Sequence, residues 1–436
     1  MTPSPEAHPR TAAASEQRLL VADQVAGVVH VLDLPDGRVR GRLRGRHLAE
    51  HAGFLALPGD RTAFVDDRAG ELVVLAPFAD ADADADSDTD ADAPGGLVEA
   101  RAAVAVPGEH LAADPSGRRL AVTSGLGRNW EPWSDLLTVV DLGAEGGPDA
   151  VRVRARVGEP GVTVVGADDP LVVLRHREPG ALAAYRHSAL LTSPPACPPA
   201  RPDAELPLPD DGHGDAHDPV HGRVFAATGE GVHRARVVDG GLTAEDPLPW
   251  GVEGRGYYLR LDPVRRTLWS CVRGGPPAPE AWPEWTNHAW WHPLDGSHRG
   301  AEHGGGSVEL GPGLVFRLAV AAHRVAFARV HPDGDELVLL DAERPRVVAR
   351  VPLPPMAGAP RRGGTPWDGV QRRAIAASPG GPLIAVSRGG HGEVLLVDSE
   401  QPDVRRELTV PTPLDEGGHM ALMVRGDGAH GDPVGR

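Results

Sequence analysis

Residues 374–410 read AIAASPGGPLIAVSRGGHGEVLLVDSEQPDVRRELTV, and this stretch decides the fold. Short apolar runs alternate in it with turn signals, such as Ser-Pro-Gly-Gly and Gly-Gly-His-Gly. Apolar runs of about four to six residues bounded by Gly and Pro are typical of β-strands rather than helices. The stretch therefore predicts four consecutive strands, the last of which, VRRELTV, is basic and alternating.

A second copy of this unit spans residues 111–157, with the segments LAADPSGRRLAVTSG, LLTVVDLG and VRVRARV. Weaker copies begin near Phe54, Val162, Asp215, Tyr257 and Leu314. A period of roughly 40 to 55 residues with four strands is the pattern of a β-propeller, whose blades bury their faces against their neighbours. The sequence thus predicts an all-β fold, a single β-propeller of about eight four-stranded blades, with seven as the alternative count.

The two ends of the chain each supply part of a blade. The N-terminal end offers three strands, at 18–23, 28–33 and 38–43, and the C-terminal end offers one strand of inner type at 420–425. Together they make one complete blade, and this pairing would close the ring and remove the free sheet edges. We therefore expect a propeller over 18–426, between a disordered leader at 1–17 and a disordered tail at 427–436.

Composition narrows the function classes. Among 436 residues, 44 Lys and Arg stand against 61 Asp and Glu, for a formal charge of -17, so nucleic acid is not an expected partner. No apolar run is long enough to span a membrane, so no membrane insertion is expected. The first 18 residues lack the apolar core of a secretory signal, which predicts a cytoplasmic location as written, or a periplasmic or extracellular one for a processed chain.

Two segments interrupt the repeat. Residues 79–94 read ADADADADSDTDADAP, a composition that cannot bury apolar surface, and we expect a disordered loop that is a spacer or a weak collector of cations. Residues 274–306 form a Trp- and His-rich insertion that we expect to cap one face of the propeller. His288 and His292 are four residues apart in it and are secondary candidates for a metal pair.

Residues 210–221 read DDGHGDAHDPVH, with three histidines and four aspartates. His213 and Asp215 stand at the start of an expected inner strand, whereas His217 and His221 fall beside the Asp-Pro turn, where we expect solvated side chains. In a propeller the first strand of each blade lines the central channel. His213 and Asp215 would then face the mouth of that channel.

Three more histidines occupy similar places. His110 stands just ahead of its inner strand, and His51 and His419 stand about two residues earlier in theirs. If the ring closes as predicted, these three belong to consecutive blades and meet His213 at one mouth. We therefore expect a central site in which the imidazoles are metal ligands and Glu109 and Asp215 are carboxylate ligands or orient the rings. For each histidine alone, an ordinary hydrogen-bonding loop residue is the alternative.

The expected donor set contains nitrogen and oxygen but no thiolate. Zn²⁺ is the metal that such a set predicts first, and Cu²⁺ would bind more tightly where it is present. Cys197 and Cys271 are each isolated in the sequence, so they form no CxxC metal motif, and whether they pair is left open.

Residues 18–23 (RLLVAD) and 28–33 (VVHVLD) resemble the first blade of the AztD-type periplasmic zinc chaperones, which are propellers of the YVTN/YncE-like kind. The segment 213–216 (HGDA) resembles a His-Gly-acid-Ala segment of that family, and His110 resembles one of its channel histidines. The resemblance implies a propeller that carries Zn²⁺ to the substrate-binding protein of an ABC-type zinc importer.

Three functions stay open at this point. The leading interpretation is a metal-binding propeller, a zinc chaperone or zinc reservoir. The second is an enzyme, such as a lyase, isomerase or hydrolase, that uses the same channel mouth on a small substrate. The sequence leans away from it because it has no G-x-S-x-G elbow, P-loop or strand-linked G-x-G-x-x-G motif. The third is a scaffold that presents the Trp-rich segment to another protein.

Overall fold

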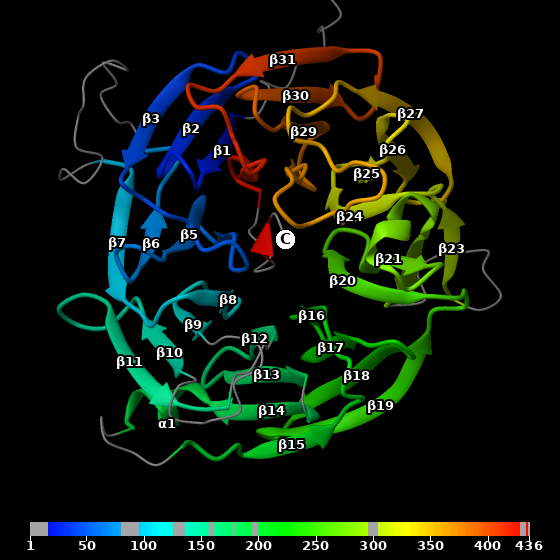
Figure 1. Cartoon of the computed structure of the whole chain (residues 1–436). Helices are drawn as coiled ribbons and strands as arrows, with labels where there is room; N and C mark the ends of the chain where they lie inside the picture. The colour runs from blue at the N-terminus through cyan, green and yellow to red at the C-terminus, as the bar shows by residue number, and fades with distance from the viewer. Residues whose placement is uncertain are drawn as a thin grey trace, which may run out of the picture.

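The computed structural model describes residues 16–79, 96–124, 136–156, 161–177, 179–193, 199–294, 304–427 and 433–434. Over these residues the strands form eight antiparallel sheets that surround a common axis (Figure 1). Seven sheets have four strands, and the eighth has a short fifth strand added at its edge. The prediction of a single all-β propeller with eight four-stranded blades is confirmed.

Two strands of each blade lie nearest the axis. From blade one to blade eight, the innermost strands are β32 (His419–Val424), β4 (Phe54–Leu57), β8 (Gly108–Ala113), β12 (Gly161–Val165), β16 (Asp215–Asp218), β20 (Arg255–Asp262), β24 (Leu314–Val320) and β28 (Ile375–Ala377). The second strands are β1 (Gln17–Asp23), β5 (Arg61–Asp66), β9 (Arg119–Ser124), β13 (Leu171–Arg177), β17 (Arg223–Ala227), β21 (Thr267–Gly274), β25 (Arg324–Val330) and β29 (Leu383–Arg388).

The other two strands of each blade lie farther from the axis. In the same blade order, the third strands are β2 (Val28–Leu34), β6 (Glu71–Leu75), β10 (Leu136–Asp141), β14 (Gly180–Arg186), β18 (Gly231–Val238), β22 (Thr286–Pro293), β26 (Asp335–Asp341) and β30 (Glu393–Asp398). The outermost strands are β3 (Val39–Arg44), β7 (Val98–Ala103), β11 (Asp149–Arg154), β15 (Ala204–Pro207), β19 (Gly241–Pro249), β23 (Gly306–Glu309), β27 (Val347–Leu353) and β31 (Arg405–Thr409). Two short helices, α1 (His187–Leu191) and the 3-10 helix η1 (Pro279–Glu284), lie outside the sheets.

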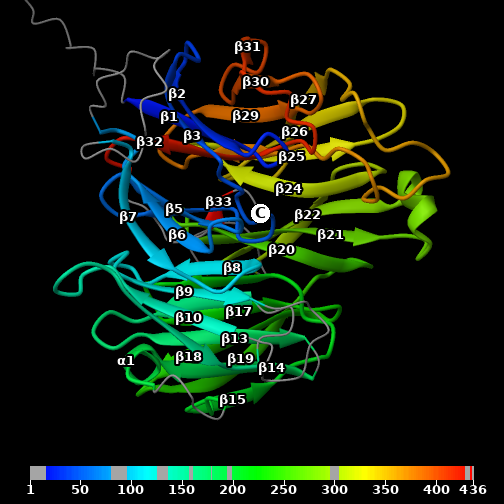
Figure 2. The same ribbon diagram turned by 60° about the vertical axis from the view of Figure 1, so that its left-hand side comes forward.

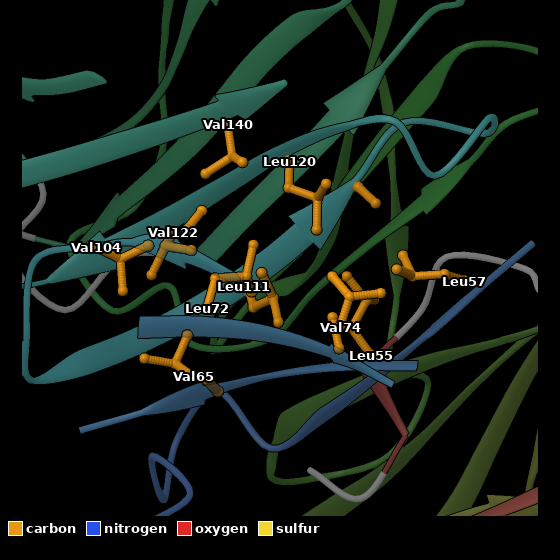
Figure 3. Close-up of a cluster of buried hydrophobic side chains, with 14 of the residues drawn as sticks. Leu55, Leu57, Val65, Leu72, Val74, Val104, Leu111, Leu120, Val122 and Val140 are labelled. Carbon is orange, nitrogen blue, oxygen red and sulfur yellow. The ribbon is translucent and has the colours of Figure 1, made fainter. Parts of the chain in front are cut away.

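The apolar runs of the sequence form strands that are buried on both faces. In β9, Leu120 and Val122 pack toward blade two, whereas Ala121 between them packs toward blade four. Successive side chains of a strand point to opposite faces, so a strand between two neighbours needs apolar residues at every position. Figure 3 shows the first of these interfaces, where Leu55 and Val74 of blade two meet side chains of blade three.

The ring closes through the two ends of the chain. β32 pairs antiparallel with β1, with Leu20 opposite Ala421 and Leu19 opposite Leu422. Figure 2 shows the red β32 beside the blue β1. Leu422 then packs toward blade eight, and Ala421 packs toward blade two. The predicted closure by N- and C-terminal strands in one blade is confirmed.

The structure divides the predicted Trp- and His-rich insertion. Residues 286–293 are β22, a regular third strand of blade six, and residue 306 begins its outermost strand. The addition to the blade within the described part of 274–306 is therefore the segment with η1, between β21 and β22. Residues 295–303 lie outside the described residues, as do 80–95, which include almost all of the Asp- and Ala-rich loop.

The ends of the chain are described only in part. Residues 1–15 lie outside the described residues, and Gln17 already belongs to β1, so a disordered leader stays a prediction. Asp427 is the first residue of the predicted tail, and its side chain accepts a hydrogen bond from the backbone N–H of Gly380 at 2.9 Å. β33 (Pro433–Val434) pairs with β4 and lies inside the ring, near its centre (Figure 1). In the described part of the chain, no helix is long and apolar enough to cross a membrane.

Shortening a buried side chain of β32, the closing strand, tests how much the ring depends on this strand. Leu422 is 3 % exposed between blades one and eight. We expect Leu422→Ala to lower the free energy of unfolding by about 2 to 5 kcal/mol, because the lost side chain leaves a cavity. Urea unfolding measures the loss. Val404, which is 56 % exposed, is the control, and Val404→Ala should stay within about 0.5 kcal/mol of the parent. Equal effects of the two changes would contradict the role of β32.

Candidate functional site

A cavity of about 300 Å³ lies at the mouth of the channel where the inner strands begin. Its lining comes from blades two to seven and from the loop before β28. The lining residues are Glu50, His51, Glu109, His110, Arg175, His213, Gly214, Asp215, Tyr257, Tyr258, Leu259, Arg260, Phe316, Arg317, Trp367 and Arg372.

Three inner strands carry a β-bulge at this level. The pairing with the second strand shifts at Glu109 in β8, at Tyr257 and Tyr258 in β20, and at Phe316 in β24. A bulge adds one residue to a strand and turns its side chain out of the regular alternation. All four of these residues line the cavity, so the bulges supply much of its wall.

His51 and Glu109 form a close polar pair in the cavity. Nδ1 of His51 lies 2.7 Å from Oε2 of Glu109, within hydrogen-bond distance. The imidazole is 63 % exposed, whereas the carboxylate is only 12 % exposed. Glu109 therefore holds one edge of an accessible ring, and the neighbouring His110 lines the same cavity from β8.

His213 is held in place from the adjacent blade. Its Nδ1–H donates to the backbone carbonyl of Tyr257 at 3.2 Å. Gly214 allows this approach, because a Cβ there would lie 2.8 Å from the same carbonyl oxygen. Burial, reinforced by the positive charge of Arg175 and other arginines, lowers the pKa of His213 to about 3. The imidazole is therefore neutral at physiological pH.

His419 lies at the start of β32 and is 3 % exposed. Its Nδ1 has no hydrogen-bond partner among the described residues. Burial lowers its pKa well below the usual value, and the charges of Arg317, Arg372 and His51 lower it further. The buried imidazole is therefore held in its neutral form.

Arg317 is the most unusual polar residue of the cavity. It is 6 % exposed in the middle of the apolar strand β24. Neither Nε nor Nη1 of its guanidinium has a hydrogen-bond partner among the described residues. Burial lowers the pKa of Arg317 to about 10, so the group is still charged at neutral pH. A buried cation without a paired counter-ion is costly by several kcal/mol, which favours an anion from outside the chain.

The other charged groups of the lining have partners within the chain. Nη1 of Arg372 donates to Oε1 of Glu50 at 2.7 Å. Nη1 of Arg175 donates to the carbonyl of Gly212 at 3.0 Å, and its Nη2 lies 3.9 Å from Oδ1 of Asp215. The three lining carboxylates thus each lie beside a cationic or imidazole group other than Arg317.

Aromatic side chains form one wall of the cavity. The rings of Tyr258 and Phe316 lie 5.4 Å apart, and the guanidinium of Arg372 lies 5.1 Å from the Phe316 ring centre. Trp367, from the loop between β27 and β28, stacks on Trp285 at 5.7 Å. A flat apolar group in the cavity would therefore meet aromatic faces beside the cationic groups.

The Trp-rich segment contributes to this wall from behind. Trp282 and Trp285 of the segment with η1 are 0 % and 4 % exposed and pack with Leu314, Val330 and Met356. Trp290 and Trp291 of β22 are buried and half-buried in the blade interfaces. The described part of this segment therefore presents no exposed Trp surface of the kind that the scaffold interpretation requires, and its capping of one propeller face stays a prediction.

The predicted metal ligands converge only in part. His51, Glu109, His110, His213 and Asp215 line one cavity, whereas His419 is buried at the start of β32 and is not part of the lining. Among the described residues, no group of three or more His, Cys, Asp and Glu side chains could hold a metal ion.

The secondary candidates lie elsewhere. His288 and His292 are on β22, the third strand of blade six, where His292 stacks on Trp290 at 6.1 Å between ring centres. Burial lowers the pKa of His292 to about 4. Neither residue lines the cavity, and a metal role for them stays a prediction.

One expectation for residues 210–221 is wrong. The sequence predicts a solvated turn at His217, but this residue is 3 % exposed within β16. The strand extends to Asp218, so the turn begins one residue later than the Asp-Pro signal indicates. His221 does lie in the exposed turn, where its Nδ1 is 3.0 Å from Oδ2 of Asp218.

Sequence reasoning missed the cationic and aromatic half of the cavity. Arg317 interrupts the otherwise apolar strand LVFRLAV, and two of the three tyrosines of the chain are adjacent at the start of β20. Those two signals could have identified Arg317, Tyr257 and Tyr258. Nothing in the sequence places Arg372 and Trp367, because they reach the cavity from a loop without regular structure.

No protein-family profile matches the chain, and curated protein sequences give no significant match. Solved structures do match it over nearly the full length. Apo AztD from Citrobacter koseri has a TM-score of 0.62 at 14 % identity, covering 94 % of this chain and 98 % of that one. A second structure of Citrobacter koseri AztD has a TM-score of 0.61 at 12 % identity, covering 96 % and 100 %.

The dihydro-heme d1 dehydrogenase NirN, in complex with DHE, has a TM-score of 0.57 at 15 % identity, covering 97 % of this chain and 78 % of that one. These likenesses show the propeller fold that the chain shares with AztD.

The neutral imidazole of His213 predicts a pH dependence of stability. The unfolded chain binds a proton at His213 below a pKa of about 6.5, whereas the folded protein does so only near 3. The free energy of unfolding therefore decreases as the pH drops below 6.5. This residue accounts for a decrease of about 2 kcal/mol at pH 5. We expect His213→Gln to flatten the fall between pH 8 and pH 5, measured by urea unfolding. His323→Gln, at an exposed histidine, is the control variant and should keep the pH dependence of the parent. A parent-like pH dependence in His213→Gln would contradict the assignment of the fall to His213.

Proposed function

We propose that the channel-mouth cavity binds a small organic anion with a flat apolar group. The single observation that carries this proposal is Arg317, a charged guanidinium at 6 % exposure whose Nε and Nη1 lack partners among the described residues. A carboxylate or phosphate would satisfy these donors with charge-assisted hydrogen bonds. The proposed ligand is thus a small organic molecule rather than a metal ion.

The rest of the lining agrees with such a ligand. The Glu50 carboxylate is paired with Arg372 at 2.7 Å, and its charge only partly offsets the burial that lowers the pKa of Arg317. Tyr258 and Phe316 lie together on β20 and β24 and offer apolar surface beside the cation. A volume of about 300 Å³ is at the lower end of ordinary ligand pockets. The cavity therefore suits a ligand of one ring and one acidic group.

Phenylacetate is the probe for this proposal, with the neutral phenylacetamide as its comparator. We expect phenylacetate to bind at least tenfold more tightly, because hydrogen bonds to charged groups are worth about 1.5–3 kcal/mol. Arg317→Met should weaken phenylacetate binding by about tenfold or more, measured by isothermal titration calorimetry. Arg405→Met, on the exposed outermost strand β31, is the matched control and should bind like the parent. Equal affinity for the acid and the amide would overturn the proposal.

Zinc carriage is the second candidate, favoured by the AztD-like fold. The resemblance implies hand-over to the substrate-binding protein of a zinc importer. His51 and Glu109 are two donors held close together, and neutral imidazoles are suitable ligands. The described arrangement does not fit a zinc site, however, because no three donors gather in the described part of the chain and Arg317 and Arg372 repel a cation.

Metal analysis of tag-free protein separates the two candidates. Stoichiometric zinc that is lost in His51→Ala and His110→Ala would support zinc carriage at the cavity. Zinc bound equally by these variants and the parent would contradict it. We expect phenylacetate binding to survive treatment with a chelator, since Arg317 needs no metal to bind a carboxylate.

A further inference from the structure

A stack of three aromatic rings and one guanidinium lies beside the cavity. The Arg273 guanidinium is 4.1 Å from the ring centre of Tyr257 and 4.3 Å from that of Trp285. The Trp285 ring is stacked in turn on Trp367, with ring centres 5.7 Å apart and an angle of 27° between the two planes. Tyr257 and Trp367 both line the cavity, so the stack meets it at two of its members.

The inner members of the stack are held in place by regular structure. Trp285 is 4 % exposed, and its Nε1–H donates to the backbone carbonyl of Pro276 at 2.8 Å. Arg273 belongs to β21, where it is paired with Asn287 of β22. Trp367 is half-buried and comes from the loop between β27 and β28. A loop residue therefore rests on a support that blade six provides.

Only part of the Trp367 ring is covered by Trp285. Because Trp367 also lines the cavity, the part of the ring that Trp285 leaves uncovered can meet a ligand there. A flat aromatic ring stacked on another gains about two- to tenfold in affinity beyond the burial of its area. A saturated ring of similar size gains the burial but lacks this additional attraction.

Trp367 and Arg317 belong to the same cavity. The bulge at Phe316 breaks the alternation of β24, so Phe316 and Arg317 both line the cavity although they are adjacent in sequence. Phe316 and Trp367 pack on one buried cluster, which includes Trp282 and Leu314. A cavity of about 300 Å³ suits one small molecule. A ligand that fills it therefore contacts both the cation and the rings.

We propose that Trp367 is a specificity-determining residue of the cavity, which selects planar aromatic carboxylic acids over aliphatic ones. The carboxylate of the ligand binds Arg317, and the ring of the ligand stacks on the Trp367 indole. Arg273 acts through Trp285 without touching the ligand and is a positioning residue. This inference rests on the proposed anion site, which anchors the ligand.

Phenylacetate and cyclohexylacetate are the probes for Trp367, because they share the carboxylate and differ in whether the ring is flat and aromatic. We expect the parent to prefer phenylacetate, and Trp367→Leu to lower this preference by about two- to tenfold, measured as the ratio of the two Kd values by isothermal titration calorimetry. Trp367→Phe keeps an aromatic face and should retain part of the preference. Phe78→Leu is the matched control, because the Phe78 ring lies 5.2 Å from the Arg18 guanidinium but is not part of the lining.

The role of Arg273 is tested by the same ratio. Arg273→Met should lower the preference for phenylacetate while leaving the Kd of cyclohexylacetate unchanged. Arg273→Lys should restore part of the preference, because an ammonium group is also attracted to aromatic faces. Weaker binding of both acids by Arg273→Met would show a merely structural role and overturn the positioning by Arg273.

Two outcomes separate this inference from the proposed function. Phenylacetate that binds to the parent with a preference that Trp367→Leu retains, or with no preference over cyclohexylacetate, overturns this inference alone. Absence of phenylacetate binding to the parent overturns the proposed function as well.

Discussion

Burial of every blade between two neighbours is the constraint on which this structure depends. Each blade is a small sheet with two apolar faces, as β9 shows with Ala121 on one side and Leu120 and Val122 on the other. A linear array would leave two such faces exposed at its ends. The β1–β32 pairing removes both, because Leu422 covers blade eight while Ala421 covers blade two. Closure therefore gives every blade two neighbours.

The candidate site is a product of the same closure. Strands that all begin around one mouth bring together side chains that are distant in the sequence, such as Glu50 and Arg372, which form an ion pair at 2.7 Å. Regular strands would point alternate residues into the blade interfaces. The bulges at Glu109, Tyr257 and Phe316 depart from that alternation and turn these side chains toward the cavity. Polar function is thus concentrated at the points where the repeat is irregular.

The charge of the cavity is opposite in sign to that of the protein. The chain carries a formal charge of -17, yet the lining concentrates guanidinium groups, one of them buried in an apolar strand. Burial and the positive charge of these groups together keep the imidazoles of His213 and His419 neutral. The field of these groups favours an anion over a cation, in agreement with the organic anion that we propose as the ligand. The AztD-like architecture is compatible with this anion or with Zn²⁺, because a propeller mouth takes its chemistry from side chains and not from its strands.

The sequence by itself determined the architecture, since four-strand units with Gly and Pro turns recur in it and the terminal strands complete one blade. It also predicted one shared mouth for His51, Glu109, His110, His213, Asp215 and His419, because their places relative to the inner strands are similar, and all of these except His419 line the cavity. Only the tertiary structure decided what that mouth contains. Bulge positions, the loop that brings Arg372 and Trp367, and the lack of partners around Arg317 among the described residues depend on packing between blades, which no local pattern records. For the same reason the local Asp-Pro signal places His217 in a turn, although pairing with β17 extends its strand and buries it.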